Sequence, residues 1–141
     1  MSEKLIGTWK FKSMVFRTEG GKTMYPYGEH LFGILIYTVS GHMSTLLMNP
    51  DRKNFASDDL KVGTAEEIKQ AYEKFDAYCG TYTVDENKGT VTHHVEGAKF
   101  PNWVGTDQVR YYELKGNRLE IKATIKMEGE DWHGEVVLER T

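Results

Sequence analysis

The chain has 141 residues, a length typical of one domain with a substantial core, and we expect residues 1–141 to form a single domain. A net charge of −3 and the lack of a long basic run argue against nucleic acid or an anionic membrane as a partner. One cysteine, no apolar targeting segment and no run of membrane-spanning length together predict a cytoplasmic protein without an internal disulfide.

Most of the chain alternates between apolar and polar residues with the period of two that is typical of β-strands. In chain order, the expected strands are 5–17, 32–39, 42–48, 81–85, 90–96, 106–114, 118–127 and 132–140. Short runs rich in Gly, Asn and Ser separate most of them and predict tight turns. The pattern therefore predicts an all-β fold, a closed antiparallel up-and-down barrel of about eight strands, which leaves no strand edge exposed.

One helix is predicted near residues 64–77. Thr64 and Glu67 have the spacing of a capping box at its start. Its apolar residues recur at helical spacing on one face, namely Ile68, Ala71, Tyr72 and Phe75. We expect this face to lie against the barrel, closing one end or covering a side.

Trp9 and Arg140 are predicted to meet where the first and last strands close the barrel. Arg140 is in phase with the apolar face of the last strand, which carries Trp132, Val136 and Leu138. A buried cation without a partner is unfavourable, and the face of a tryptophan ring is a suitable partner. We therefore expect Trp9 and Arg140 to stack.

The Gly7-Thr8-Trp9 opening, together with Arg140 at the end, resembles the barrel-closing signature of lipocalins. Further motifs follow in the order found in a group of small lipocalin-like domains of bacteria and fungi: Tyr25-Pro26-x-Gly28, Tyr37-x-x-x-Gly41-x-Met43-Ser44, Pro50-Asp51-Arg52, Tyr78-x-Gly80-x-Tyr82, Val91-Thr92-His93-His94-Val95, Pro101-Asn102-Trp103-x-Gly105 and Gln108-x-Arg110. The resemblance covers nearly the whole chain. It implies a lipocalin-like (calycin-type) barrel, in some members associated with specialised metabolism, and implies no particular reaction or cofactor.

His93 is the first candidate for a functional side chain. A barrel of eight strands is wide enough to hold one small ligand. His93 shares a strand face with the apolar Val91 and Val95, whereas His94 points to the opposite face. Inside a cavity, His93 would orient a ligand or exchange a proton with it. The alternative is a core histidine that is hydrogen-bonded to a neighbour.

Arg110 is the second candidate, because its strand is expected to turn Gln108, Arg110 and Tyr112 inward. A guanidinium group in a cavity would bind a carboxylate, an enolate or a phenolate, whereas on the outer face it would be an ordinary surface charge. Three aromatic residues are expected to form the wall or rim of the cavity, or else to be ordinary core residues: Tyr37, Tyr82 and Trp103.

No metal site and no cofactor site are predicted. Adjacent histidines on a strand cannot share one ion, and the other histidines lack ligand spacing. The chain contains no dinucleotide-binding glycine motif, phosphate loop or serine elbow. Cys79 follows the expected helix end, where a buried structural thiol is more usual than the alternative of a nucleophile near a histidine.

Three functions are open at this point. The leading hypothesis is a carrier, sensor or sequestering protein for a small hydrophobic or amphipathic molecule. The second is a cofactor-independent isomerase, cyclase or hydro-lyase that uses His93 as acid or base and Arg110 as anion stabiliser. The third is a structural or interaction module with a filled barrel. The first two require His93 and Arg110 to face one roomy cavity.

Overall fold

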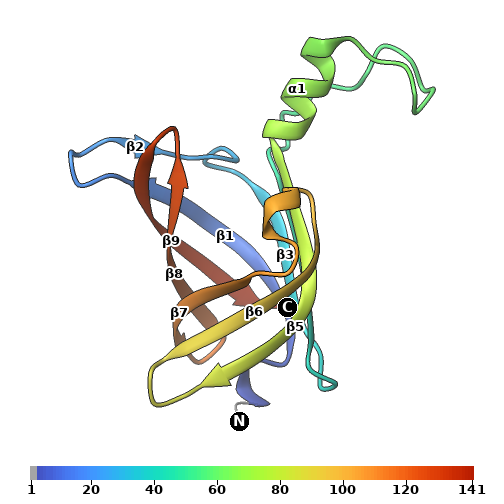
Figure 1. Cartoon of the computed structure of the whole chain (residues 1–141). Helices are drawn as coiled ribbons and strands as arrows, with labels where there is room; N and C mark the ends of the chain where they lie inside the picture. The colour runs from blue at the N-terminus through green and yellow to red at the C-terminus, as the bar shows by residue number, and fades with distance from the viewer. Residues whose placement is uncertain (1–2) are drawn as a thin grey trace.

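The computed structural model describes residues 3–141 (Figure 1). Its elements in this range are η1 (Glu3–Leu5), β1 (Gly7–Arg17), β2 (Thr23–Met24), β3 (Phe32–Tyr37), β4 (His42–Met48), α1 (Ala65–Glu73), β5 (Phe75–Asp85), β6 (Thr90–Ala98), η2 (Pro101–Trp103), β7 (Asp107–Lys115), β8 (Arg118–Met127) and β9 (Glu130–Arg140), where η denotes a short 3-10 helix. Between residues 3 and 141, no helix combines the length and the apolar character that crossing a membrane requires.

The strands form a closed antiparallel barrel, which confirms the predicted fold. Their order around the sheet is β2-β1-β3-β4-β5-β6-β7-β8-β9, and pairing between β1 and β9 closes the circle. Eight long strands make the barrel, while the two-residue β2 adds only to the end of β1. Each long strand pairs with the next long strand along the sequence, as expected for antiparallel strands that short turns can join.

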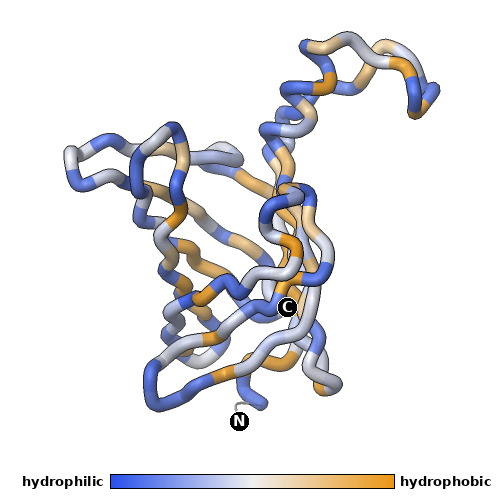
Figure 2. The backbone as a smooth tube through the Cα atoms, in the orientation of Figure 1, coloured by the Kyte–Doolittle hydropathy of each residue, from blue (hydrophilic) through white to orange (hydrophobic). Residues whose placement is uncertain are grey.

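The core lies inside the barrel because every second side chain points inward. In β9, the inward positions Trp132, Gly134, Val136 and Leu138 are buried, and the residues between them are exposed or half-buried. Figure 2 shows hydrophobic positions interspersed with hydrophilic ones along much of the barrel, whereas β3 is apolar along nearly its whole length. The period of two thus sorts core from surface residues throughout the sheet.

Trp9 and Arg140 close one end of the barrel, as predicted. Trp9 is fully buried, and its indole N–H donates to the Leu5 carbonyl oxygen over 2.8 Å. The Arg140 guanidinium carbon lies 4.2 Å from the centre of the Trp9 ring, and the group donates to the Ile6 carbonyl oxygen. Gly7 has φ +133°, and a Cβ there would lie 2.8 Å from the guanidinium, so only glycine leaves room for it.

The helix α1 lies at the opposite end and corrects two expectations. It ends at Glu73 rather than near residue 77, and it buries no side chain. Figure 1 shows it standing off the barrel within the connection between β4 and β5. Ile68 and Tyr72, on its apolar face, are 55% and 44% exposed. The capping box of Thr64 and Glu67 is confirmed. The helix does not cover a side of the barrel, and Tyr72 is its one residue that lines the cavity at this end.

The early end of the helix follows from strand pairing. All seven residues of β4 pair with β5, from His42 opposite Thr81 to Met48 opposite Phe75. A strand starting at residue 81 would leave most of the backbone groups of β4 without partners in the sheet. The segment from Phe75 onward therefore extends as a strand, and tertiary pairing overrides its helical spacing.

We expect Ile68→Ala to change the free energy of unfolding by less than about 0.5 kcal/mol, because the side chain is largely exposed and alanine favours helix. Urea denaturation measures this. Leu47→Ala in β4 is the matched control, since Leu47 is buried; it is expected to cost about 2–5 kcal/mol. Equal losses in the two variants would mean that α1 packs on the barrel in solution.

Candidate functional site

The barrel encloses a cavity of about 370 Å³ near the end that carries α1. This volume lies within the range of small-molecule sites. The barrel strands supply most of its wall, and Tyr72 of α1 and Phe100 beside η2 line it as well. The end closed by Trp9 and Arg140 is not part of the lining, so the cavity occupies the other half of the barrel.

One part of the cavity wall is apolar. It is built from inward positions of β1, β3, β4, β8 and β9, which include Phe11, Met14, Phe16, Leu35, Leu47, Ile121, Ile125, Met127 and Val136. Leu, Ile, Met and Phe side chains offer an adaptable apolar surface without hydrogen-bonding groups. This wall can hold the hydrocarbon body of a ligand.

Polar groups gather on the remaining wall, at β5, β6, β7 and the segment before β3. The polar lining residues on this side are Tyr27, Asp76, Tyr78, His93, Lys99 and Arg110, while Thr45 of β4 and the exposed Lys126 of β8 are polar lining residues elsewhere. Burial raises the pKa of Asp76, while the positive charges of Lys99 and Arg110 act in the opposite direction. Lys99 is held by the carbonyl oxygens of Tyr72 and Phe75, to which its ammonium group donates. One acidic and two basic side chains therefore meet at this wall.

His93 is buried at the centre of this wall between two tyrosines. The Tyr37 hydroxyl lies 2.7 Å from Nε2, and the Tyr78 hydroxyl lies 2.7 Å from Nδ1. Burial lowers the pKa of His93 to about 3, and the positive charge of Arg110 acts in the same direction. The imidazole is therefore neutral near neutral pH, and both of its nitrogens already have partners.

Arg110 is buried in the cavity wall, which confirms that the Gln108, Arg110 and Tyr112 face of β7 points inward. Its guanidinium carbon lies 5.6 Å from the centre of the Trp103 ring. One terminal nitrogen donates to the Val109 carbonyl oxygen over 3.3 Å. Burial raises the pKa of Tyr78, and a hydrogen bond from Arg110 opposes that rise. Arg110 thus brings a positive charge into a mostly apolar cavity.

Three of the five predicted site residues line the cavity: His93, Arg110 and Trp103. Tyr37 and Tyr82 point inward but lie outside this lining. Tyr37 is buried behind His93, and the Tyr82 hydroxyl donates to the Thr38 carbonyl oxygen. Their rings contact each other, with centroids 4.7 Å apart. The two rings thus pack beside the cavity wall, and a ligand-contacting role for the five residues stays a prediction.

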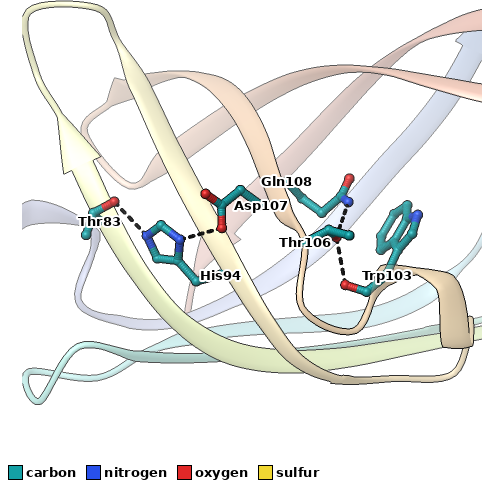
Figure 3. A network of polar contacts seen from close by, with 6 residues as sticks. All are labelled: Thr83, His94, Trp103, Thr106, Asp107 and Gln108. Carbon is teal, nitrogen blue, oxygen red and sulfur yellow. Dashed lines mark hydrogen bonds and ion pairs between the residues drawn. The ribbon is translucent and has the colours of Figure 1, made fainter.

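Trp103 is placed by hydrogen bonds around η2. The Thr106 hydroxyl donates to the Trp103 carbonyl oxygen over 2.7 Å, and Gln108 Nε2 donates to the Thr106 hydroxyl over 2.9 Å (Figure 3). The ring also packs edge-on against Tyr78, with centroids 5.4 Å apart. The loop after β6 is thereby fixed with its indole beside Arg110.

His94 lies on the outer face of the barrel, as the alternation of β6 predicts. Its Nδ1 is 2.7 Å from an Asp107 carboxylate oxygen, and its Nε2 is 3.0 Å from the Thr83 hydroxyl (Figure 3). The two adjacent histidines thus serve opposite sides of one strand. Within residues 3–141, His, Cys, Asp and Glu side chains form no group of three or more that would hold a metal ion.

Sequence reasoning missed Tyr78 and Asp76. Both fall where the helix was expected to end, so neither was assigned to a strand face. In β5 the alternation places Tyr78 inward with Gly80 and Tyr82, and this spacing was a usable signal. The same alternation leaves Cys79 exposed on the outer face, which corrects the expectation of a buried thiol.

Comparisons with known proteins agree with this architecture. A curated relative, the 4'-hydroxy-3'-methoxypropiophenone carrier protein of Aspergillus oryzae, is 35% identical over 85 residues, which are 56% of this chain and 77% of the relative. No solved structure matches the chain significantly. The family described as the lipocalin-like domain matches residues 6–141. The chain therefore belongs to the lipocalin-like domain family.

Proposed function

We propose that this protein binds a small amphipathic organic molecule in the barrel, as a carrier, sensor or sequestering protein. The family and the name of the Aspergillus relative support small-molecule binding in general. The observation that supports an amphipathic ligand is the buried Arg110 in a cavity whose opposite wall is apolar. A buried guanidinium favours an acceptor oxygen, and an apolar wall favours a hydrocarbon body.

The proposed ligand is an aryl compound with a ketone or carboxylate oxygen. Its ring would rest on the apolar wall, and its oxygen would face Arg110 beside Trp103. The relative is named as a carrier of an aryl ketone that also bears a hydroxyl and a methoxy group. That compound is therefore the first ligand to test.

Binding is favoured over catalysis by the state of His93. Its two nitrogens are engaged by Tyr37 and Tyr78, and its pKa of about 3 makes it a weak base. This arrangement argues against the alternative of an isomerase, cyclase or hydro-lyase that uses His93 as acid or base. The cavity of about 370 Å³ likewise argues against a filled barrel.

Non-denaturing mass spectrometry of the natively purified protein tests binding directly. We expect a retained organic molecule, or an added mass when 4'-hydroxy-3'-methoxypropiophenone is supplied. Conversion of that compound into a product would favour the enzyme instead. We further propose that the protein is cytoplasmic, that it serves specialised metabolism, and that residues 1–141 act as one domain.

Arg110→Leu is expected to weaken binding of 3-phenylpropionate about ten- to hundredfold, because a charge-assisted hydrogen bond to a buried group is lost. Binding of the neutral methyl ester should weaken less. Isothermal titration calorimetry measures both affinities. Lys126→Leu is the control, since it removes the same charge from an exposed residue of the lining. Equal losses in both variants, or for both ligands, would contradict a specific role for Arg110.

A further inference from the structure

A chain of hydrogen bonds crosses the barrel from Tyr37 through His93 to Tyr78. The two hydroxyl oxygens lie 2.7 Å from Nε2 and from Nδ1 of the imidazole. A neutral imidazole carries one N–H donor and one acceptor nitrogen. One tyrosine must therefore donate to His93, and the other must accept from it. Which tyrosine does which decides what the cavity offers to a ligand.

The surroundings of Tyr37 indicate which tyrosine donates to His93 and which one accepts from it. Its side chain is 1% exposed and lies outside the cavity lining. Within residues 3–141, His93 is the hydrogen-bond partner of its hydroxyl. If Nε2 carried the proton, the Tyr37 hydroxyl would accept that bond, and its own proton would be buried without an acceptor, which is unfavourable. Tyr37 therefore donates to Nε2, and the proton of His93 is on Nδ1.

This tautomer determines the role of Tyr78. Nδ1–H donates to the Tyr78 oxygen, which also accepts a hydrogen bond from Arg110. The hydroxyl proton of Tyr78 then has neither His93 nor Arg110 available as an acceptor. Tyr78 lines the cavity. Asp76 is near enough to influence Tyr78 electrostatically, but the two described side chains share no hydrogen bond.

We infer that Tyr78 donates its hydroxyl proton into the cavity and, together with Arg110, forms a two-donor site for one acceptor oxygen of the ligand. The ligand class that fits two converging donors is a ketone or a carboxylate, whose oxygen has two lone pairs. The ligand half of this inference rests on the proposed binding function. The tautomer is a property of the free protein. His93 and Tyr37 act as positioning residues, because they orient Tyr78 without touching the ligand.

Long-range 1H–15N correlation spectra of the ligand-free protein test the tautomer. The His93 ring is assigned as the signal that His93→Gln removes. We expect a protonated Nδ1 and an unprotonated Nε2 at neutral pH. A proton on Nε2 would overturn the inference, since Tyr78 would then donate to His93 rather than into the cavity. This result does not depend on any ligand.

Two probes with the same skeleton test the donor. Propiophenone has the ketone oxygen, and propylbenzene lacks it. We expect Tyr78→Phe to weaken propiophenone about two- to tenfold, the value of one hydrogen bond, and to leave propylbenzene nearly unchanged. The matched control is Tyr111→Phe, which removes an exposed hydroxyl from the outer face of β7 and should change both affinities less than about twofold.

The outcomes separate the inference from the proposed function. Equal weakening of both probes by Tyr78→Phe, or an equal effect of Tyr111→Phe, would overturn the donor role. If the unsubstituted protein binds neither probe, aryl ketones fail as the proposed ligand class. The two-donor site for a ketone then fails with them, while the spectrum still decides the tautomer.

Discussion

Trp9→Ala is expected to lower the free energy of unfolding by about 3–5 kcal/mol, the range for truncation of a core aromatic side chain. Trp9 is fully buried, donates to the Leu5 carbonyl oxygen and stacks under Arg140. Its removal leaves a cavity at the closed end and deprives the buried face of the guanidinium of its partner. Equilibrium urea denaturation, followed by far-UV circular dichroism, measures the loss.

Trp103→Ala is the matched control, because it removes the same side chain from a half-buried position on η2. Its cost should be clearly smaller, and it should affect ligand binding rather than the closure of the barrel. A loss below about 1 kcal/mol for Trp9→Ala would mean that Trp9 is not a buried plug. Arg140→Leu should lie between the two, since the hydrogen bonds to Ile6 and Lys4 are lost but the ring stays.

His93 should make the protein less stable as the pH falls. Its pKa is about 3 in the folded protein, below the ordinary value of 6.5, so the unfolded chain binds a proton that the folded protein excludes. The stability is therefore fully present above pH 6.5 and decreases toward pH 3. The slope attributable to this residue is about 1.4 kcal/mol per pH unit, and its total is about 3–5 kcal/mol.

The measurement compares urea denaturation between pH 7 and pH 4 for the unsubstituted protein and His93→Gln. The variant loses its hydrogen bonds to the tyrosines and is less stable at pH 7. The slope of its free energy of unfolding against pH should be smaller, by the amount that corresponds to about one bound proton. His94→Gln, on the outer face of the same strand, is the control and should keep the steeper decline. If the free energies of unfolding of the protein and of His93→Gln fall in parallel with pH, the pKa of His93 is the same in the folded and the unfolded chain, and the prediction is wrong.

The alternation of residues predicted the strands and their faces well. It placed His93 inside and His94 outside, turned Arg110 inward, and set Arg140 in phase with the core. These features depend on the side-chain period of a strand, which is local and does not change when the sheet closes. The pairing of Trp9 with Arg140 was predictable for a related reason, since a cation in a core phase requires a nearby partner.

What the sequence alone determined was the fold and, in the segments that it assigned to strands, which side chains point into the barrel. The tertiary structure decided how far along the barrel axis each of them lies. Tyr37 and Tyr82 point inward as expected, yet neither lines the cavity, while Tyr78 lines it beside Arg110. It also decided where α1 ends, because β4 needed partners along its whole length. Periodicity shows which way a side chain points but not how far along the barrel axis it lies. That position depends on the register between strands that are distant in the sequence.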